Sequence, residues 1–351
     1  MIRSNAIWWR SALLAASIAF VAPVHGQPAP AAAEERFKAM SRDAEAKGLA
    51  EPFKGVTTDG KVVAGLFPVR CTGVSTEPER KAAAAFLAAL SAKGLKLSRD
   101  VMRLNETLAE MKNNWKEYGE GRYFLTVMGT PSEKGPWGFQ LDGHHLIINY
   151  FVLGDQVVMT PAFWGSEPVV ARSGKYRGTA ILQEEQDKGL ALINALPEAQ
   201  RKKAVIEVSK TGNNNVGEAF KDNVVLAYAG VKASELPEKQ REQLLELVAL
   251  YVNNMDDGHA KVKMEDVRRH LADTHFAWVG DTKPDSVFYY RVHSPVILIE
   301  FDHQKPIALG DRGGPPTRDH VHVLVRTPNG NDYGKDLLRQ HYKDHPHPHG
   351  H

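Results

Sequence analysis

Two stretches near the C-terminal end of the chain place ionisable residues inside apolar, strand-like sequence. Glu300 and Asp302 stand two positions apart in the first stretch, and His320 and His322 do the same in the second. Residues at positions i and i+2 of a β-strand project from the same face. Paired imidazoles beside paired carboxylates supply the ligands of many metal sites and the groups of acid–base catalysis. The spacing therefore indicates a metal or acid–base site, and it does not identify a substrate.

A metal centre is the sharper of these two interpretations. The candidate metal ligands are His293, Glu300, His320 and His322. Two histidines with one carboxylate would leave coordination positions open for water or substrate, as catalytic metal sites do, and a divalent zinc or iron ion suits such ligands. We expect segments 287–293, 296–303 and 320–326 to be strands of one sheet. The donor atoms should then converge on one face of that sheet.

The carboxylates also have a purely structural interpretation. Most residues of the 296–303 segment are large and apolar, which predicts a strand buried on both sides. A carboxylate inside such a strand is costly unless it is paired, hydrogen-bonded or bound to a metal. Glu300 could therefore form a salt bridge with Arg291 or Arg326 instead. In that case His320 and His322 would face solvent, and the metal hypothesis would fall.

Further polar residues near these strands complete the predicted site. The residues predicted to be catalytic are Glu300, Asp302 and Arg326, and those predicted to contact substrate are Tyr289, Arg291, Asn329, Asn331 and Asp332. The stretch after Arg326 is rich in Asn and Gly at the end of a strand, where binding residues commonly lie. A turn without further function explains its composition equally well. Elsewhere, His144 and His145 are adjacent, so at most one of them can join a site on a given sheet face.

The N-terminus predicts export. Arg3 and Arg10 accompany an apolar run at 12–22 that is too short to span a bilayer, and Gly26 suits a signal-peptidase site. We expect residues 1–26 to be a signal peptide and the mature chain not to insert in a membrane. Cys71 is the only cysteine, so no intrachain disulfide can form. An exported protein without disulfides is typical of a bacterial periplasm, so a periplasmic or secreted location is expected.

Charge and composition limit the classes of partner that the protein is expected to bind. The chain has 44 Lys and Arg and 42 Asp and Glu, and loss of the two arginines in 1–26 leaves 42 of each. A neutral mature chain lacks the basic patch expected of a nucleic-acid-binding protein or of one that binds anionic membranes. We therefore expect a small-molecule substrate or ligand, and no nucleic acid.

Hydrophobic periodicity predicts an α+β fold, an antiparallel sheet with helices packed against it. Strands are expected at 123–128, 145–152, 156–160, 275–279, 287–292, 296–301 and 321–325, and helices at 184–203, 234–255 and 264–271. Ser98 is interpreted as the N-cap of another helix. A Pro/Ala spacer at 27–33 should precede a single domain at 34–343, and the His-rich tail at 344–351 should be disordered.

Two function classes fit these features. The first is an exported metal-dependent enzyme, in which metal-activated water attacks an ester, an amide or a similar bond of a small molecule. A metal-dependent oxidoreductase is its close competitor, since two histidines and a carboxylate also suit iron. The second class is a non-catalytic periplasmic protein that binds a small molecule. The G-x-S-x-G, H-E-x-x-H and C-x-x-C-H motifs are absent from the sequence, which argues against the common serine hydrolases, zincins and cytochromes c.

Several long motifs resemble one family. They are Gln140-Leu-Asp-Gly-His-His-Leu-Ile-Ile-Asn-Tyr150, Gly258-His259, Thr274-His-Phe-Ala-Trp278, the run from His293 to His303, and the run from His322 through Asn329-Gly-Asn-Asp-Tyr-Gly334 to Leu338. Together they resemble the family known as domain of unknown function 3500, whose members are typically exported bacterial proteins. The resemblance implies no catalytic residues, because the family has no established activity. The short connection at 91–94 departs from the family pattern. This departure implies that a segment forming part of a pocket wall is lost here.

Overall fold

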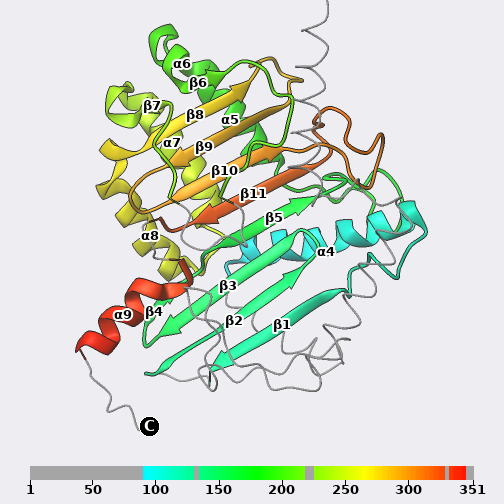
Figure 1. Ribbon diagram of the computed structural model, residues 1–351, viewed down its shortest axis with the longest axis horizontal. Coiled ribbons are helices and arrows are strands. Elements are labelled where there is room, and N and C mark those ends of the chain that lie inside the picture. Colours follow the sequence, from blue (N-terminus) through cyan, green and yellow to red (C-terminus); the bar gives the residue numbers. More distant parts are fainter. Residues whose placement is uncertain (1–89, 130–133, 218–224, 329–331, 345–351) are drawn as a thin grey trace, which may run out of the picture. The chain divides into compact units, whose positions relative to one another are not determined.

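The three segments expected to carry the site lie side by side in one large sheet (Figure 1). The structure, a computed structural model, describes residues 90–129, 134–217, 225–328 and 332–344. Its strands are β1 (Tyr123–Gly129), β2 (Pro136–Gly143), β3 (Leu146–Leu153), β4 (Gln156–Val158), β5 (Ala162–Ser166), β6 (Val205–Glu207), β7 (Val231–Lys232), β8 (His275–Gly280), β9 (Phe288–His293), β10 (Leu298–His303) and β11 (Val321–Arg326). The order across the sheet is β1-β2-β3-β5-β11-β10-β9-β8-β6, with β4 beside β3 and β7 beside β8.

The sheet is antiparallel, as predicted, except where β6 pairs in parallel with β8. Each predicted strand is present, and every residue of β10 is buried, as its sequence indicated. Four strands were not predicted, and two of them, β6 and β7, have only three and two residues. β2 contains Pro136 and two glycines, and β5 has only five residues, one of them Gly165. Proline and glycine are poor strand formers, so these segments carry a weak strand signal.

Prolines mark the start of two of the helices. The helices are α4 (Ala92–Lys112), α5 (Gln183–Ala195), α6 (Glu198–Ala204), α7 (Glu238–Val252), α8 (Asp257–Arg269) and α9 (Lys335–Asp344), with short 3-10 turns η1 (Ala233–Glu235), η2 (Leu271–Asp273) and η3 (Asp332–Gly334). The predicted helix at 184–203 is two helices, because Pro197 starts a new one. The helix predicted at 234–255 begins later, after Pro237.

The N-cap prediction at Ser98 was wrong. Ser91 caps α4, and its hydroxyl oxygen accepts a hydrogen bond from the Gly94 amide at 3.0 Å. Ser98 lies within the helix, where its hydroxyl donates to the Gly94 carbonyl at 2.9 Å. The connection at 91–94 is thus the first turn of α4. A Cβ at Gly94 would lie 2.0 Å from the carbonyl oxygen of Asn254, so only glycine allows this close approach.

Helices cover one face of the sheet. The Tyr290 side chain points to that face, where its hydroxyl contacts the Tyr251 hydroxyl of α7 and donates to the Glu185 carbonyl of α5 at 3.0 Å. A Cβ at Gly189 would lie 2.3 Å from the Tyr290 ring, so α5 packs directly on β9. In Figure 1, α5 and α7 are seen behind the strands.

The ionisable residues point to the opposite face. Because Arg291 pairs with Glu300, and Asp302 pairs with His322, these side chains share one face of β9, β10 and β11. Residues 210–217, which we call the asparagine loop, cross part of this face and contact β10. The helices thus provide the core, and the other face is left for polar groups.

The described residues belong to one compact unit. None of their helices is long and apolar enough to cross a membrane. The predicted signal peptide at 1–26, the spacer at 27–33, Cys71 and the tail from His345 onward lie outside the described residues.

Candidate metal centre

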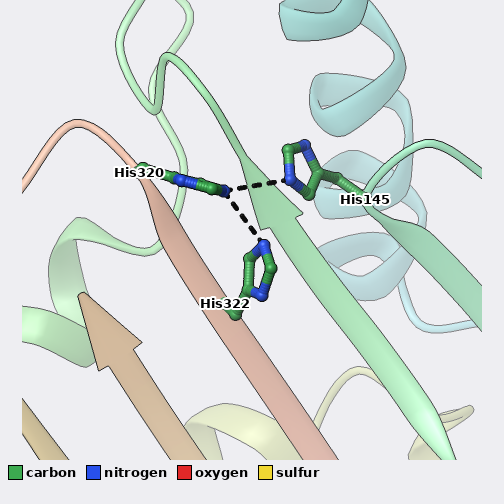
Figure 2. A group of neighbouring side chains, drawn as sticks. All are labelled: His145, His320 and His322. Atoms are coloured by element: carbon green, nitrogen blue, oxygen red, sulfur yellow. Dashed lines mark hydrogen bonds between the residues drawn. The ribbon is translucent and has the colours of Figure 1, made fainter. Parts of the chain in front are cut away.

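Three imidazoles meet at the beginning of β11, on the face opposite the helices. His322 belongs to β11, His320 directly precedes it, and His145 lies in the turn between β2 and β3. The Nε2 atom of His320 lies 3.0 Å from Nε2 of His322 and 3.2 Å from Nε2 of His145 (Figure 2). Among the described residues this is the group of His, Cys, Asp and Glu side chains that could hold a metal ion. We call it the histidine cluster.

Local backbone geometry places His145 in the cluster. It has a φ of 62°, and its carbonyl oxygen accepts a hydrogen bond from the Gly165 amide at 2.8 Å. Positive φ is uncommon for a residue with a side chain and marks a conformation held by its surroundings. A Cβ at Gly165 would lie 2.6 Å from the Val321 carbonyl oxygen and 3.1 Å from Cδ2 of His322. The absence of a side chain at Gly165 therefore leaves the space that the imidazoles fill.

The proton of His320 can be placed from its hydrogen bond. Its Nδ1 lies 2.7 Å from the carbonyl oxygen of Lys305. A carbonyl oxygen can only accept, so Nδ1 carries the proton and Nε2 presents a lone pair to the other two imidazoles. Zinc bound to nitrogen at about 2.0–2.1 Å in a tetrahedral site separates its ligand nitrogens by about 3.3 Å. The observed separations of 3.0 and 3.2 Å are close to that value.

Burial keeps these imidazoles neutral. It lowers the pKa of His145 and of His322 well below the usual histidine value, and the neighbouring histidines lower both further. Burial also lowers the pKa of His320, while the carboxylate of Glu167 opposes that shift. Metal ligands must be deprotonated, so neutral imidazoles at neutral pH bind a metal without first releasing a proton.

Aromatic side chains surround the cluster. The ring of His144 lies 4.0 Å from that of His145, centroid to centroid, and the Phe163 ring lies edge-on to His322 at 4.9 Å. His144 is not a ligand candidate. Its Nδ1 lies 2.8 Å from Oδ1 of Asn105, and the Asn105 amide group donates to the Gly119 carbonyl at 2.9 Å. Of the two adjacent histidines, the structure turns His145 to the cluster and His144 to α4.

Glu300 is held elsewhere. Its carboxylate accepts hydrogen bonds from the Val216 amide at 2.9 Å, the Gly217 amide at 2.6 Å and the Tyr289 hydroxyl at 2.6 Å. Burial raises its pKa, and these donors oppose the rise. The structure therefore brings Glu300 to the asparagine loop and not to the imidazoles. The alternative salt bridge from Glu300 to Arg291 or Arg326 is not formed either.

Asp302 is bound in the same way. Its Oδ2 accepts from the amides of Asn214 at 2.7 Å and Asn215 at 3.0 Å, and from the side chain of Gln304 at 2.5 Å. Its Oδ1 lies 3.0 Å from the ammonium group of Lys210. We call Glu300 and Asp302 the carboxylate pair. The hydrogen bonds of the carboxylate pair anchor the asparagine loop to β10. They do so although Asp302 lies directly opposite His322 in the neighbouring strand.

The other residues predicted for the site are dispersed. Arg326 donates to Asp332 at 2.7 Å and to the Gly217 carbonyl at 3.0 Å. Arg291 donates to the Ala227 carbonyl at 3.0 Å. Of the four predicted metal ligands, His320 and His322 converge, whereas Glu300 does not join them. The ring of His293 packs against that of Tyr228 instead, with the centroids 4.3 Å apart. Asn329 and Asn331 lie outside the described residues.

Sequence reasoning missed Glu167. This buried residue follows β5, and its carboxylate accepts from the amides of Ile307 at 3.1 Å, Ala308 at 2.9 Å and Leu309 at 2.9 Å. It also lies 3.7 Å from Nδ1 of His320. No motif surrounds Glu167 in the sequence, so no signal there could have identified it. His145, in contrast, was weighed as a candidate, and only its partners were unknown.

The chain belongs to a family described as a protein of unknown function, DUF3500, whose model matches residues 68–335. The family predicted from the sequence motifs is thereby confirmed, and the matched region contains the whole histidine cluster. No curated protein and no solved structure matches the chain.

Proposed function

We propose that the protein is a metal-dependent enzyme whose metal is held by His145, His320 and His322. One observation carries this proposal. The three Nε2 atoms converge although the Nδ1 proton of His320 is committed to Lys305, so His320 cannot donate to either neighbour. Its single lone pair cannot accept two good hydrogen bonds at once. A cation at the centre of the cluster would satisfy all three nitrogens.

The donor set favours hydrolysis over oxidation. Three neutral histidines with an open fourth position form the ligand set of a zinc site that activates water, whereas non-haem iron oxygenases use two histidines and a carboxylate. The histidine cluster contains no carboxylate. Neutral ligands leave the charge of a divalent ion undiminished, which lowers the pKa of bound water and polarises a substrate carbonyl. We therefore favour zinc-dependent hydrolysis of an ester, an amide or a similar bond in a small molecule, in the periplasm or outside the cell.

Metal content tests this proposal directly. The tail histidines could bind metal loosely, so the test protein has His345, His347, His349 and His351 replaced by Gln. Elemental analysis after zinc loading and desalting should give one metal ion per chain. The double variant His145→Ala/His322→Ala should give none, while His275→Ala, a histidine of β8 outside the cluster, should retain the ion. Metal content unchanged in the double variant would refute the proposal.

A second candidate function, ligand binding without catalysis, is favoured by two buried polar atoms on β9. Nε of Arg291 and Nδ1 of His293 have no hydrogen-bond partner in the part of the chain that the structure describes. An unpaired buried polar group costs about 1–3 kcal/mol, which an oxygen acceptor on a ligand would recover. Burial lowers the pKa of His293 to about 4, and the nearby positive charge of Arg291 contributes to that shift. Tyr228, whose ring lies over His293, is 47% exposed and borders the position.

Thermal unfolding with a panel of small carboxylic acids and sugars tests the second candidate. A ligand that binds here should stabilise the metal-free protein and lose its effect in Arg291→Ala. Stabilisation that persists in Arg291→Ala, or that requires the histidine cluster, would exclude this position as the binding site.

A further inference from the structure

The segment 305–309 holds the imidazole that completes the histidine cluster. The carbonyl oxygen of Lys305 accepts the Nδ1 proton of His320 at 2.7 Å. A metal-binding histidine is oriented by the acceptor of its other N–H, so any movement of this carbonyl would turn the imidazole. What fixes Lys305 therefore fixes the geometry of the cluster.

Glu167 anchors this segment from the side of β5. Its carboxylate accepts three consecutive backbone amides, those of Ile307, Ala308 and Leu309, at 2.9 to 3.1 Å. The Glu167 side chain is 3% exposed, so these hydrogen bonds form away from bulk water. Consecutive amides around one carboxylate form a rigid anion-binding turn. The segment cannot shift without breaking several buried hydrogen bonds.

The charge of Glu167 also faces the cluster. Its Oε2 lies 3.7 Å from Nδ1 of His320, and none of the lysines and arginines in the described part of the chain forms an ion pair with it. A negative charge behind a histidine makes that histidine a stronger donor to a cation on its other nitrogen. In the low-dielectric surroundings of a buried pair, this effect is larger than at a surface.

Asn213 anchors the same segment from the asparagine loop. Its side-chain oxygen accepts the Lys305 amide proton at 2.9 Å. The loop is itself held by Glu300 and Asp302 through four backbone amides. These contacts link Asp302 through Asn213 and Lys305 to His320, whereas Glu300 binds the amides of Val216 and Gly217 at the far end of the loop.

We infer that Glu167 is a positioning residue of the metal centre: it holds the 305–309 segment against His320 and places a negative charge behind that imidazole. The inference rests on the proposed function, because it assigns Glu167 a role toward a bound metal. Asn213 supports the same segment from the other side, with one hydrogen bond in place of three.

Two measurements on the tail-substituted chain test this inference. The first is zinc affinity, by competition with a chelator. Glu167→Gln should weaken zinc binding by about 10- to 100-fold, the range for loss of an outer-sphere partner of a metal-binding histidine. The matched control is Glu300→Gln, another buried carboxylate that accepts backbone amides but does not face an imidazole. It should leave zinc affinity within about 3-fold of the unsubstituted protein, although it lowers stability.

The second measurement is the tautomer of His320 in the metal-free protein, from the nitrogen chemical shifts of its imidazole. The unsubstituted protein should show the proton on Nδ1, and Glu167→Gln should show a mixture of tautomers. This readout separates the two proposals. If the unsubstituted protein binds no zinc, the proposed function fails, and the tautomer still reports whether Glu167 positions His320.

Two outcomes would overturn the inference. One is a folded Glu167→Gln protein with unchanged zinc affinity and an unchanged His320 tautomer, which would make Glu167 an anchor of the segment alone. The other is an equal loss of affinity in Glu300→Gln, which would trace the effect to general destabilisation. If Glu167→Gln does not fold, Asn213→Ala takes its place, since Asn213 is exposed and loosens the same segment. It should weaken zinc binding less than about 10-fold, and an unchanged affinity would count against the inference.

Discussion

The histidine cluster and the carboxylate pair lie on one face of the same sheet, and they use their polar atoms in opposite ways. Asp302 and His322 are paired across β10 and β11. Yet the carboxylate of Asp302 accepts two backbone amides and the side chain of Gln304, whereas Nε2 of His322 lies 3.0 Å from Nε2 of His320. Two pairs of ionisable residues with the same spacing thus have different roles. One pair belongs to a structural anchor and the other to a candidate metal site.

The two regions differ in how much capacity their polar atoms have left for binding a ligand. The carboxylate pair meets backbone N–H groups of the asparagine loop, and Oδ1 of Asp302, without a hydrogen bond from the described residues, lies 3.0 Å from the ammonium group of Lys210. Buried groups paired within the protein have little capacity for a ligand. The histidine cluster brings three imidazoles together, and the lone pair on Nε2 of His320 faces nitrogens of the other two, an arrangement that a bound metal ion would stabilise. We therefore expect function where buried polar atoms lack partners within the protein. The first two predictions separate the regions by this criterion.

The largest expected effect is stabilisation by zinc. A ligand that binds only the folded state at 1,000 times its Kd stabilises that state by about 4 kcal/mol. Zinc at such a concentration should raise the free energy of unfolding of the tail-substituted protein by this amount. It should leave His322→Ala unchanged, because loss of one of three ligands removes the site. Urea unfolding with and without zinc measures both, and equal stabilisation of the two proteins would show that zinc binds elsewhere.

Loss of a carboxylate should have the reverse signature. Glu300 is fully buried and accepts two amides and the Tyr289 hydroxyl. Glu300→Ala leaves these donors unpaired, so the free energy of unfolding should fall by about 3 kcal/mol. The stabilisation by zinc should persist, because Glu300 lies outside the cluster. Glu242→Ala, an exposed substitution on α7, is the control and should change stability by less than about 0.5 kcal/mol. Loss of zinc binding in folded Glu300→Ala would contradict this separation of the two regions.

The two regions should also respond to pH with opposite signs. Burial lowers the pKa of His145 and of His322 well below the usual value, so the unfolded chain binds more protons below about pH 6.5. Their contribution to stability is present above that pH and is lost as the pH falls. Burial raises the pKa of Glu300 and of Asp302. Their contribution is therefore fully present below the ordinary carboxyl range of about pH 4 and is lost as the pH rises through the raised values.

Unfolding of the metal-free protein between about pH 7 and pH 5 measures the histidine part. Stability should fall as the pH falls, and His322→Gln should reduce the slope by at most about 1.4 kcal/mol per pH unit, the contribution of one proton. A slope unchanged in His322→Gln would show that this imidazole is not held neutral by the fold.

Strand periodicity explains how much of this arrangement could be predicted. Alternation of apolar and ionisable residues identified β9, β10 and β11 and the face to which Glu300 and His322 point, because that pattern is local in the sequence. The family was recognised for a similar reason, since its motifs are continuous runs of residues. The predicted pair His320 and His322 lies in one group of imidazoles, and the role of these residues as metal ligands stays a prediction.

Partners from distant segments could not be predicted. His145 and His320 are 175 positions apart, and they meet only because β5 lies between β3 and β11 in the sheet. The donors to the carboxylate pair are backbone amides of 214–217. Nearly every residue carries such an amide, so no side-chain pattern reveals which ones will be used. Sheet order and backbone donors were thus decisive, and neither is visible in local sequence.

The smallest expected effect concerns His144, which tests where the histidine cluster ends. His144 is an imidazole beside His145, but its Nδ1 is hydrogen-bonded to Asn105 at 2.8 Å, so it resembles the carboxylate pair in having a partner within the protein. His144→Ala should therefore leave zinc affinity within about 3-fold, below the loss typical of an outer-sphere partner of a ligand. Stability should fall by about 1 kcal/mol through the lost hydrogen bond. Chelator competition and urea unfolding measure the two effects. A loss of zinc affinity as large as that in His145→Ala would make His144 a fourth ligand and extend the metal site toward α4.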